Sequence, residues 1–240
     1  MTGAAPASPA LAGAHVDDAV LALRPDYRAL LVVVTGVRGG PSDAASEAAL
    51  ARAERSARER LAGAPPETLP EIATWRDALL GFGVRPRQAR SSVEALLRRV
   101  DAGLPRIDRL TDLYNAVSVE HLLPIGGEDL DRYRGAPRLV RARGDEPFDT
   151  VADGVPTTVV ADDGEVVWRD DLGVTCRRWN WRQCARTRLD ETTTNILFII
   201  DGLQPTTTEA LEAAGAALVD AVTAGPTAAV VESRLLGPAT

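Results

Sequence analysis

The chain has 240 residues, of which 45% are hydrophobic and only 4% aromatic, and its formal net charge is −7. This length and composition are typical of one globular domain with an aliphatic core, and the acidic balance argues against non-specific binding to nucleic acid. No apolar run approaches the roughly 20 residues that a membrane-spanning helix needs. Two cysteines make no disulfide framework. We therefore expect a soluble, cytoplasmic protein with no membrane partner.

The first 90 residues predict one strand and two helices. Residues 1–14 contain prolines and no basic region, which indicates a disordered tail rather than a signal peptide. The apolar run at 30–34 is typical of a buried strand. Residues 42–63 are Ala-rich with charges at helical spacing, so they predict an amphipathic helix, and residues 71–83 predict another.

A capping box begins the next predicted helix. Ser91 can accept the backbone N–H of Glu94, and the Glu94 side chain can reach back to the helix N-terminus. We expect this helix to end at Gly103. A further helix is expected over residues 110–122, because Pro124 cannot continue it.

The remaining residues predict strands and one last helix. Residues 157–161 and 166–168 flank an Asp-Gly pair, which is a strong hairpin signal. Residues 196–200 predict a central strand, and residues 208–222 predict a helix with threonines for its cap. This order of elements indicates an α+β fold in which helices pack on a mixed, largely antiparallel sheet.

We expect a single domain over residues 15–224, between the N-terminal tail and a C-terminal tail at 225–240. Arginine is concentrated in the middle of that domain. Residues 85–188 hold 18 of the 27 basic residues but 17 of the 34 acidic ones, so the flanks carry the negative charge. The chain contains no lysine, and a coding bias explains that choice but not the clustering. Two interpretations stay open: a surface that binds an anionic ligand, or solvated faces.

Standard catalytic motifs are missing. Without lysine there is no phosphate-binding loop of the Gly-Lys type, and the glycines at 36–40 lack the Rossmann spacing. A zinc site would have to recruit His121, Cys176 and Cys184, which lack the spacing of ligand pairs. We therefore expect neither a metal nor a cofactor.

Three features of the sequence allow an interpretation as ligand contacts. Arginines alternate with Trp179 and Trp181, so guanidinium groups can bind phosphates while rings stack on bases, or both rings can face the core. Asn115 lies in an apolar helical stretch, where a buried amide is either a structural brace or a ligand contact. Gly126 and Gly127 either allow close backbone approach to a ligand or form a tight turn.

Four stretches between residues 75 and 205 read RSSVEALLRR, LPRIDRLTDLYNAVS, GGEDLD and RRWNWRQ. Together they resemble the B3/B4 domain of the phenylalanyl-tRNA synthetase beta subunit, and more closely the free-standing B3/B4 proteins. The resemblance implies a mixed α/β fold and a pocket that hydrolyses wrongly charged tyrosyl-tRNA. It also implies that a positioned water attacks the ester, without a metal or a covalent nucleophile.

The resemblance carries over unevenly to single residues. Asp112 and Asn115 match an Asp-x-x-Asn element on the pocket side of the synthetase domain. Of its Pro-x-His-x-Phe-Asp element, this chain keeps the first and last residues and has Gly126 in place of the histidine. The acidic residue that reads the tyrosine hydroxyl falls near Ile199, with Asp201 close by.

The leading hypothesis is a stand-alone editing factor that binds charged tRNA and hydrolyses the ester of a mismatched aminoacyl group. Its expected catalytic residue is Asn115, and backbone donors or Glu94 would orient the water. The expected pocket residues are Ser91, Ser118, Gly126, Gly127 and Asn180. The expected RNA-binding residues are Arg90, Arg177, Arg178, Trp179 and Arg182.

Two other functions stay open. A module that recognises tRNA or an aminoacyl group without cleaving it is favoured by the missing histidine at Gly126. A pocket for a free amino acid or a derivative is favoured by the net charge of −7. RNA binding would weaken steeply with salt, whereas binding of a zwitterion would not. The expected partner is tRNA, and DNA is not expected.

Overall fold

The computed structural model describes residues 8–225 and 228–238. Its helices are α1 (Pro9–Ala12), α2 (Asp18–Leu23), α3 (Ala44–Leu61), η1 (Pro66–Thr68), α4 (Pro70–Gly81), α5 (Ser92–Leu97), α6 (Arg109–His121), η2 (Leu130–Arg132) and α7 (Thr208–Thr223). Its strands are β1 (His15–Val16), β2 (Arg28–Thr35), β3 (Ile125–Asp129), β4 (Arg138–Arg141), β5 (Pro147–Ala152), β6 (Val155–Val160), β7 (Val166–Arg169), β8 (Val174–Arg177), β9 (Arg182–Gln183), β10 (Asn195–Gly202) and β11 (Val230–Leu236). Among these described helices, none is long and apolar enough to cross a membrane.

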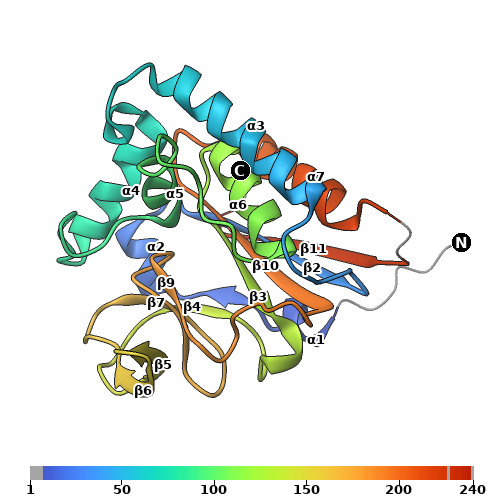
Figure 1. The fold of residues 1–240 in the computed structure, drawn as a ribbon. Coiled ribbons are helices and arrows are strands. Elements are labelled where there is room, and N and C mark those ends of the chain that lie inside the picture. Colours follow the sequence, from blue (N-terminus) through green and yellow to red (C-terminus); the bar gives the residue numbers. More distant parts are fainter. Residues whose placement is uncertain (1–7, 226–227, 239–240) are drawn as a thin grey trace, which may run out of the picture.

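An antiparallel sheet in the order β11-β2-β10-β3 lies at the centre of the molecule (Figure 1). β2 and β10 pair along their whole length. Helices α3, α6 and α7 cover one face of this sheet, and aliphatic side chains of β2 and β10 pack against them. The two strands predicted at 30–34 and 196–200 are confirmed.

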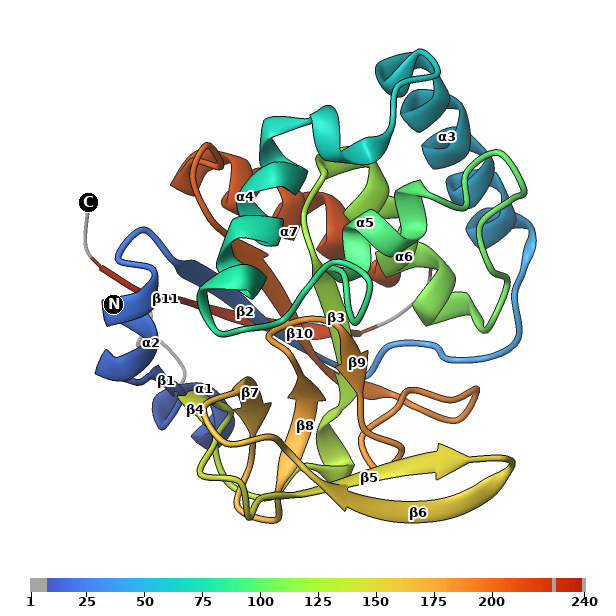
Figure 2. The same cartoon turned by 90° about the vertical axis from the view of Figure 1, so that its left-hand side faces the viewer.

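The other face of the central sheet packs against a second sheet, in the order β1-β4-β7-β8-β9 (Figure 2). β1 and β4 are parallel, and the remaining pairs of this sheet are antiparallel. Leu31 and Val33 of β2 meet Trp168 of β7 in the core between the sheets. The prediction of an α+β fold with helices on a mixed, largely antiparallel sheet is confirmed.

The prediction of a hairpin around residues 163–164 is wrong. β6 pairs with β5, through a tight turn at Asp153 and Gly154 with φ angles of 51° and 80°. β7 pairs with β4 and β8 instead. The physical reason is burial, because β7 is buried at its first three residues whereas β6 is exposed at five of its six positions.

Helix α5 is shorter than expected. The Ser91 hydroxyl accepts the backbone N–H of Glu94 at 3.4 Å, as predicted. The helix ends at Leu97 instead of Gly103, and the Glu94 side chain turns to arginines rather than to the helix N-terminus. The capping box is therefore half formed. The other four predicted helices are confirmed as α3, α4, α6 and α7.

Both expected tails contribute to the fold where the structure describes them. Leu11 of α1 is buried in the core between the sheets. β11 pairs with β2 at one edge of the central sheet, and Leu236 at its end is buried. These apolar side chains are the reason that the two segments fold onto the domain. The rest of the two expected tails, at 1–7, 226–227 and 239–240, lies outside the described residues.

Candidate functional site

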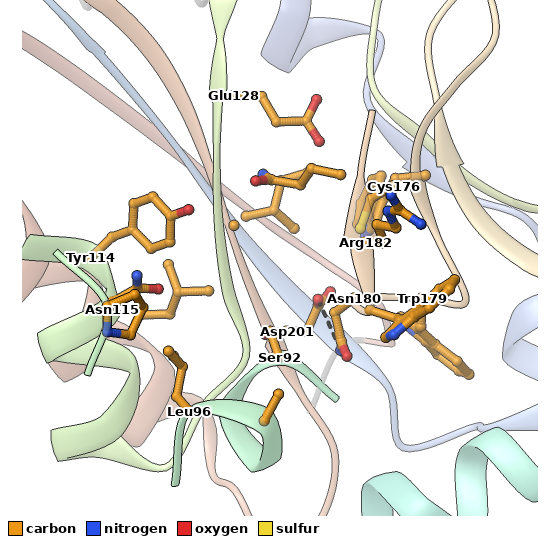
Figure 3. A pocket seen from close by; sticks show the side chains of 18 of the residues that line it. Ser92, Leu96, Tyr114, Asn115, Glu128, Cys176, Trp179, Asn180, Arg182 and Asp201 are labelled. Atoms are coloured by element: carbon orange, nitrogen blue, oxygen red, sulfur yellow. Dashed lines mark hydrogen bonds between the residues drawn. The ribbon is translucent and has the colours of Figure 1, made fainter. Parts of the chain in front are cut away.

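A cavity of about 320 Å³ lies between helices α5 and α6, strands β3 and β10, and the turn between β8 and β9 (Figure 3). The helices form one wall and the β8–β9 turn forms the opposite one. These elements come from distant parts of the chain, so tertiary folding assembles the cavity. Its size lies at the lower end of small-molecule sites and suits an amino-acid-sized ligand.

The helical wall comes from α5 and α6. Ser92 and Leu96 are four residues apart on α5, so they lie on the same face of that helix and line the cavity. Tyr114 and Asn115 of α6 line it as well. Asn115 is buried, and its amide has no hydrogen-bond partner among the described residues. A structural brace needs a hydrogen-bond partner, and Asn115 has none in this part of the chain. This favours the interpretation of Asn115 as a ligand contact.

The floor comes from β3 and β10, which are neighbours in the central sheet. Gly126 lies opposite Ile199 in the antiparallel register. Side chains alternate along a strand, so Glu128 shares the face of Gly126 and Asp201 shares the face of Ile199. Both carboxyl-bearing residues consequently line the cavity.

The turn between β8 and β9 has an uncommon backbone conformation. Arg178 and Trp179 have φ angles of 48° and 68°, in the left-handed region that residues with side chains rarely adopt. The buried Trp179 ring packs edge-on against Tyr27 and Trp75, at centroid distances of 5.1 and 5.6 Å. Aromatic packing of this kind holds the turn in place, and the four residues that follow Trp179 line the cavity.

Asp201 is held by two hydrogen bonds. The Tyr27 hydroxyl donates to one carboxylate oxygen at 2.5 Å, and the Asn180 amide donates to the other at 3.3 Å. Burial raises the pKa of Asp201 to about 7, although both hydrogen bonds act to lower it. Asp201 thus titrates near neutral pH while protein groups already occupy both of its oxygens.

Glu128 differs from Asp201 in having a free oxygen. It is 1% exposed, and burial raises its pKa to about 7. Its Oε2 atom lacks a hydrogen-bond partner, and so do Ser92 Oγ and Asn180 Oδ1, two other buried atoms of residues that line the cavity. Buried polar atoms in folded proteins are nearly always paired. Together with the Nε1 atoms of Trp168 and Trp179, these atoms leave hydrogen-bonding capacity at the cavity that a ligand or water can meet.

Gly126 and Gly127 lie in β3 and make room for neighbouring side chains rather than forming a turn. The Gln183 amide donates to the Gly127 carbonyl at 2.8 Å, and a Cβ on Gly126 would lie 3.1 Å from the Gln183 nitrogen. A Cβ on Gly127 would lie 2.9 Å from Leu189 and 3.1 Å from Phe198. Of these two glycines, Gly126 lines the cavity and Gly127 does not.

Three expected site residues lie away from the cavity. Glu94 is fully buried in an ion-pair cluster with Arg76 at 2.6 Å and Arg98 at 3.0 Å. Burial raises its pKa, but the hydrogen bonds and charges of these arginines outweigh burial and hold the pKa below its ordinary value. Ser91 caps α5, and Ser118 donates to a backbone carbonyl just beyond α6. Glu94 therefore stabilises the packing of α4 on α5, and it does not reach a ligand in the cavity.

Asp112, matched by resemblance to the pocket side of the synthetase domain, also lies away from the cavity. Its carboxylate accepts the Ser42 hydroxyl at 2.5 Å and the Ile107 backbone N–H at 2.9 Å. It fastens the loop before α6 to the loop before α3.

The expected RNA-binding arginines are mostly engaged within the protein. Arg177 forms an ion pair with the buried Glu165, and Arg90 lies 3.4 Å from Glu94. Neither lines the cavity. Their charges are largely compensated, which leaves them poorly placed to bind phosphate.

Arg182 and Arg99 are different, because both are exposed, line the cavity and have no ion pair among the described residues. Arg178 lies over the Trp181 ring at 4.5 Å, and Arg182 lies at 6.0 Å from the same ring. Both tryptophans line the cavity, but Trp181 is partly exposed whereas Trp179 is fully buried in the core. Trp181 thus fits the interpretation of a ring that can stack on a ligand, and Trp179 fits the interpretation of a ring that packs in the core.

Several polar residues of the cavity were not among the expected site residues, namely Ser92, Arg99, Tyr114, Glu128, Gln183 and Asp201. A signal existed for Asp201, because it is a single acid directly after an apolar strand stretch, where a carboxyl group is costly. No sequence signal singles out Ser92 or Gln183, since the folding of α5 and of the β8–β9 turn decides where they point.

No group of three or more His, Cys, Asp or Glu side chains in the described part of the chain could hold a metal ion. Cys176 lines the cavity, and burial raises the pKa of its thiol and of the Cys184 thiol. Protonated thiols are poor nucleophiles and poor metal ligands.

Helices on a largely antiparallel sheet, with a cavity between them that apolar side chains and two buried acids line, define an α+β domain. A family model, the B3/4 domain, matches residues 74–216, and the chain belongs to this family. Among solved structures, it is similar to an N-terminal fragment of the phenylalanyl-tRNA synthetase beta subunit from Pyrococcus horikoshii, at 14% identity and a TM-score of 0.46. That match covers 93% of this chain and 50% of the fragment, so the chain spans about half of the fragment's length. A comparison with curated proteins found no match.

Proposed function

We propose that this protein binds the aminoacyl end of charged tRNA and hydrolyses the ester of a mismatched aminoacyl group. The observation that carries the proposal is the cavity, where the buried atoms Glu128 Oε2, Asn180 Oδ1 and Ser92 Oγ are left unpaired and offer hydrogen bonds to a small polar ligand. Arg99 and Arg182 line the same cavity without ion pairs, and guanidinium groups bind phosphates well. Membership of the B3/4 family and the resemblance of four sequence stretches support tRNA as the partner.

In this proposal the free amide of Asn115 orients the attacking water. The water oxygen forms a bond to the ester carbonyl carbon, the bond to the ribose oxygen breaks, and that oxygen takes up the proton. The products are a free amino acid and an uncharged tRNA end. Orientation of the water by fixed polar groups can supply much of the rate enhancement.

The test is to incubate the purified protein with a panel of matched and mismatched aminoacyl-tRNAs and to follow loss of the charged form. Loss confined to one aminoacyl group, reduced in Asn115→Ala and retained in the control Asn195→Ala, supports editing. Asn195 is a suitable control because it lies at the end of β10 remote from Asp201. No loss across the panel with folded protein overturns the hydrolytic part of the proposal.

A second candidate function is binding of a free amino acid or a derivative without RNA. The ion pairs of Arg90 and Arg177 favour it, because these arginines are not free to bind phosphates. Salt separates the two functions, since each phosphate contact releases counterions and makes RNA affinity fall steeply with ionic strength. A shallow salt dependence of tRNA affinity would favour the small ligand.

A further inference from the structure

We infer that the cavity selects a ligand that buries a hydrogen-bond donor, an ammonium or a hydroxyl group, against Glu128. This inference rests on the proposed function for the aminoacyl nature of the ligand and adds what that ligand must carry.

Residues that line the cavity leave both acceptors and donors unpaired. Glu128 Oε2 and Asn180 Oδ1 are acceptors without a hydrogen-bond partner, and the Nε1 atoms of Trp168 and Trp179 are donors without one. The Asn180 nitrogen already donates to Asp201, which fixes its oxygen as the free atom. An ionised carboxylate and an amide oxygen accept hydrogen bonds and donate none. At a pH where Glu128 is ionised, the group that satisfies these two acceptors must therefore be a donor.

Glu128 and Asp201 differ in their hydrogen bonds. Both oxygens of Asp201 are occupied by Tyr27 and Asn180, so Asp201 positions the β8–β9 turn rather than waiting for a ligand. Glu128 has no ion pair among the described residues.

No positive charge from the described residues lies beside the Glu128 carboxyl group. The hydroxyls of Tyr133, Thr175 and Thr187 hydrogen-bond to its carboxyl group and act to lower its pKa, but they carry no positive charge, and the nearby charge of Asp170 has the same sign. A buried carboxyl group without a counter-charge is strongly disfavoured as an anion. An ammonium group from the ligand would supply that counter-charge, and a hydroxyl group would supply the missing hydrogen bond.

Two sources of the donor share this chemistry: the α-amino group of the aminoacyl ligand and its side chain. Amino-acid amides keep the acyl group and resist ester hydrolysis, so they report binding alone. Leucinamide against 4-methylpentanamide removes only the α-amino group. Norvalinamide against 2,4-diaminobutyramide converts a terminal methyl group into an ammonium, and valinamide against threoninamide introduces a hydroxyl.

Each amide is titrated at about pH 8, where Glu128 is mostly ionised. Binding is followed by tryptophan fluorescence, because Trp168, Trp179 and Trp181 line the cavity. The proteins are the wild type, Glu128→Leu, Glu128→Gln and the control Glu120→Gln. Glu120 is a partly exposed acid of α6 outside the cavity. Thermal unfolding shows that each variant is folded.

We expect the donor-bearing member of at least one pair to bind the wild type about 10- to 100-fold more tightly, as for a hydrogen bond to a charged group. Glu128→Leu should abolish that preference and Glu120→Gln should keep it. Glu128→Gln should reduce a preference for ammonium and keep one for hydroxyl, so this variant decides the matter if Glu128→Leu does not fold. The pair that responds identifies the source of the donor.

Equal affinities within every pair, or a preference that survives in Glu128→Leu, would overturn the inference. Its failure is distinguishable from failure of the proposed function. Hydrolysis of charged tRNA together with equal amide affinities removes the inference and leaves the function. A donor preference without any hydrolysis leaves the inference and removes the hydrolytic function.

Discussion

Gln183 lies against Gly126: its amide nitrogen would be 3.1 Å from a Cβ at that position, and it donates to the next carbonyl of β3 at 2.8 Å. The space at the position where the resembling family has a histidine is therefore occupied by Gln183. Any side chain at position 126 must move Gln183 before it can reach the cavity. Polar chemistry at this point of the cavity thus comes from β9 instead of β3.

This packing predicts unequal costs for two neighbouring substitutions. Gly126→Ala meets only the flexible end of Gln183, so we expect a loss in the free energy of unfolding below about 1 kcal/mol. Gly127→Ala meets Leu189, Phe198 and Tyr114 at 2.9 to 3.1 Å, so we expect a loss of about 1–3 kcal/mol. Urea denaturation of both variants tests the order, and equal losses would contradict this account of β3.

The network around Asp201 predicts a large effect of its removal on stability. Asp201→Ala leaves the buried Tyr27 hydroxyl and the Asn180 amide without an acceptor. We expect a loss of roughly 1–3 kcal/mol for each unsatisfied group. Tyr27→Phe is the milder comparison, because it removes the donor and leaves no unpaired hydroxyl. Denaturant titration measures both, and an Asp201→Ala variant as stable as Tyr27→Phe would exclude the network.

Stability should fall as the pH rises through the neutral range. The pKa of Glu128 rises from an ordinary 4.5 to about 7 in the folded protein, so the folded state holds a proton that the unfolded state has lost. Stability from this group is complete below about pH 4.5 and is lost as the pH passes 7, on the order of 3 kcal/mol. The thermal midpoint should be lower at about pH 8 than at about pH 5.5.

Glu128→Gln should flatten this pH dependence, because glutamine does not titrate. Asp201, whose pKa is also raised to about 7 by burial, should leave part of the slope in that variant. A thermal midpoint that rises between about pH 5.5 and 8 in the wild type would show that neither carboxyl group is protonated in the folded protein.

Glu94 should matter for folding and not for ligand binding. Glu94→Gln removes the anion between Arg76 and Arg98, and we expect a loss of at most about 3 kcal/mol because both arginines are partly exposed. Affinity for the amide ligands should be unchanged when the variant is folded. A fall in affinity without a fall in stability would show that Glu94 contributes to ligand binding.

The exposed arginines should control RNA affinity. Arg99→Ala and Arg182→Ala should each weaken tRNA binding and reduce the slope of log affinity against log salt by about 1. Arg177→Ala should leave the slope unchanged and lower stability, because its partner Glu165 is buried. Filter binding over a range of salt concentrations measures all three. Unchanged affinity in Arg99→Ala and Arg182→Ala would exclude phosphate contacts at this cavity.

Local pattern was enough to predict most of the elements and the fold class. The apolar runs at 30–34 and 196–200 are strands because they are short, β-rich and buried on both faces, and the helical spacing at 42–63 and 208–222 is confirmed. The hairpin prediction failed because an Asp-Gly pair specifies a turn but not which strands pair across it. The Asp153–Gly154 turn joins β5 and β6 in the hairpin that forms, and the apolar side chains of β7 are buried where it pairs with β4 in a different sheet.

The sequence by itself singled out the stretches that hold Asn115, Gly126, Asn180 and Arg182, and tertiary folding brings these residues to one cavity. Only the tertiary structure decided which side chains face it. A residue's direction depends on where its helix ends and which strand lies opposite, and neither is encoded within a few neighbouring residues. That is why Glu94 turns to its arginines while Glu128, on a buried strand, is left with an unpaired oxygen in the cavity.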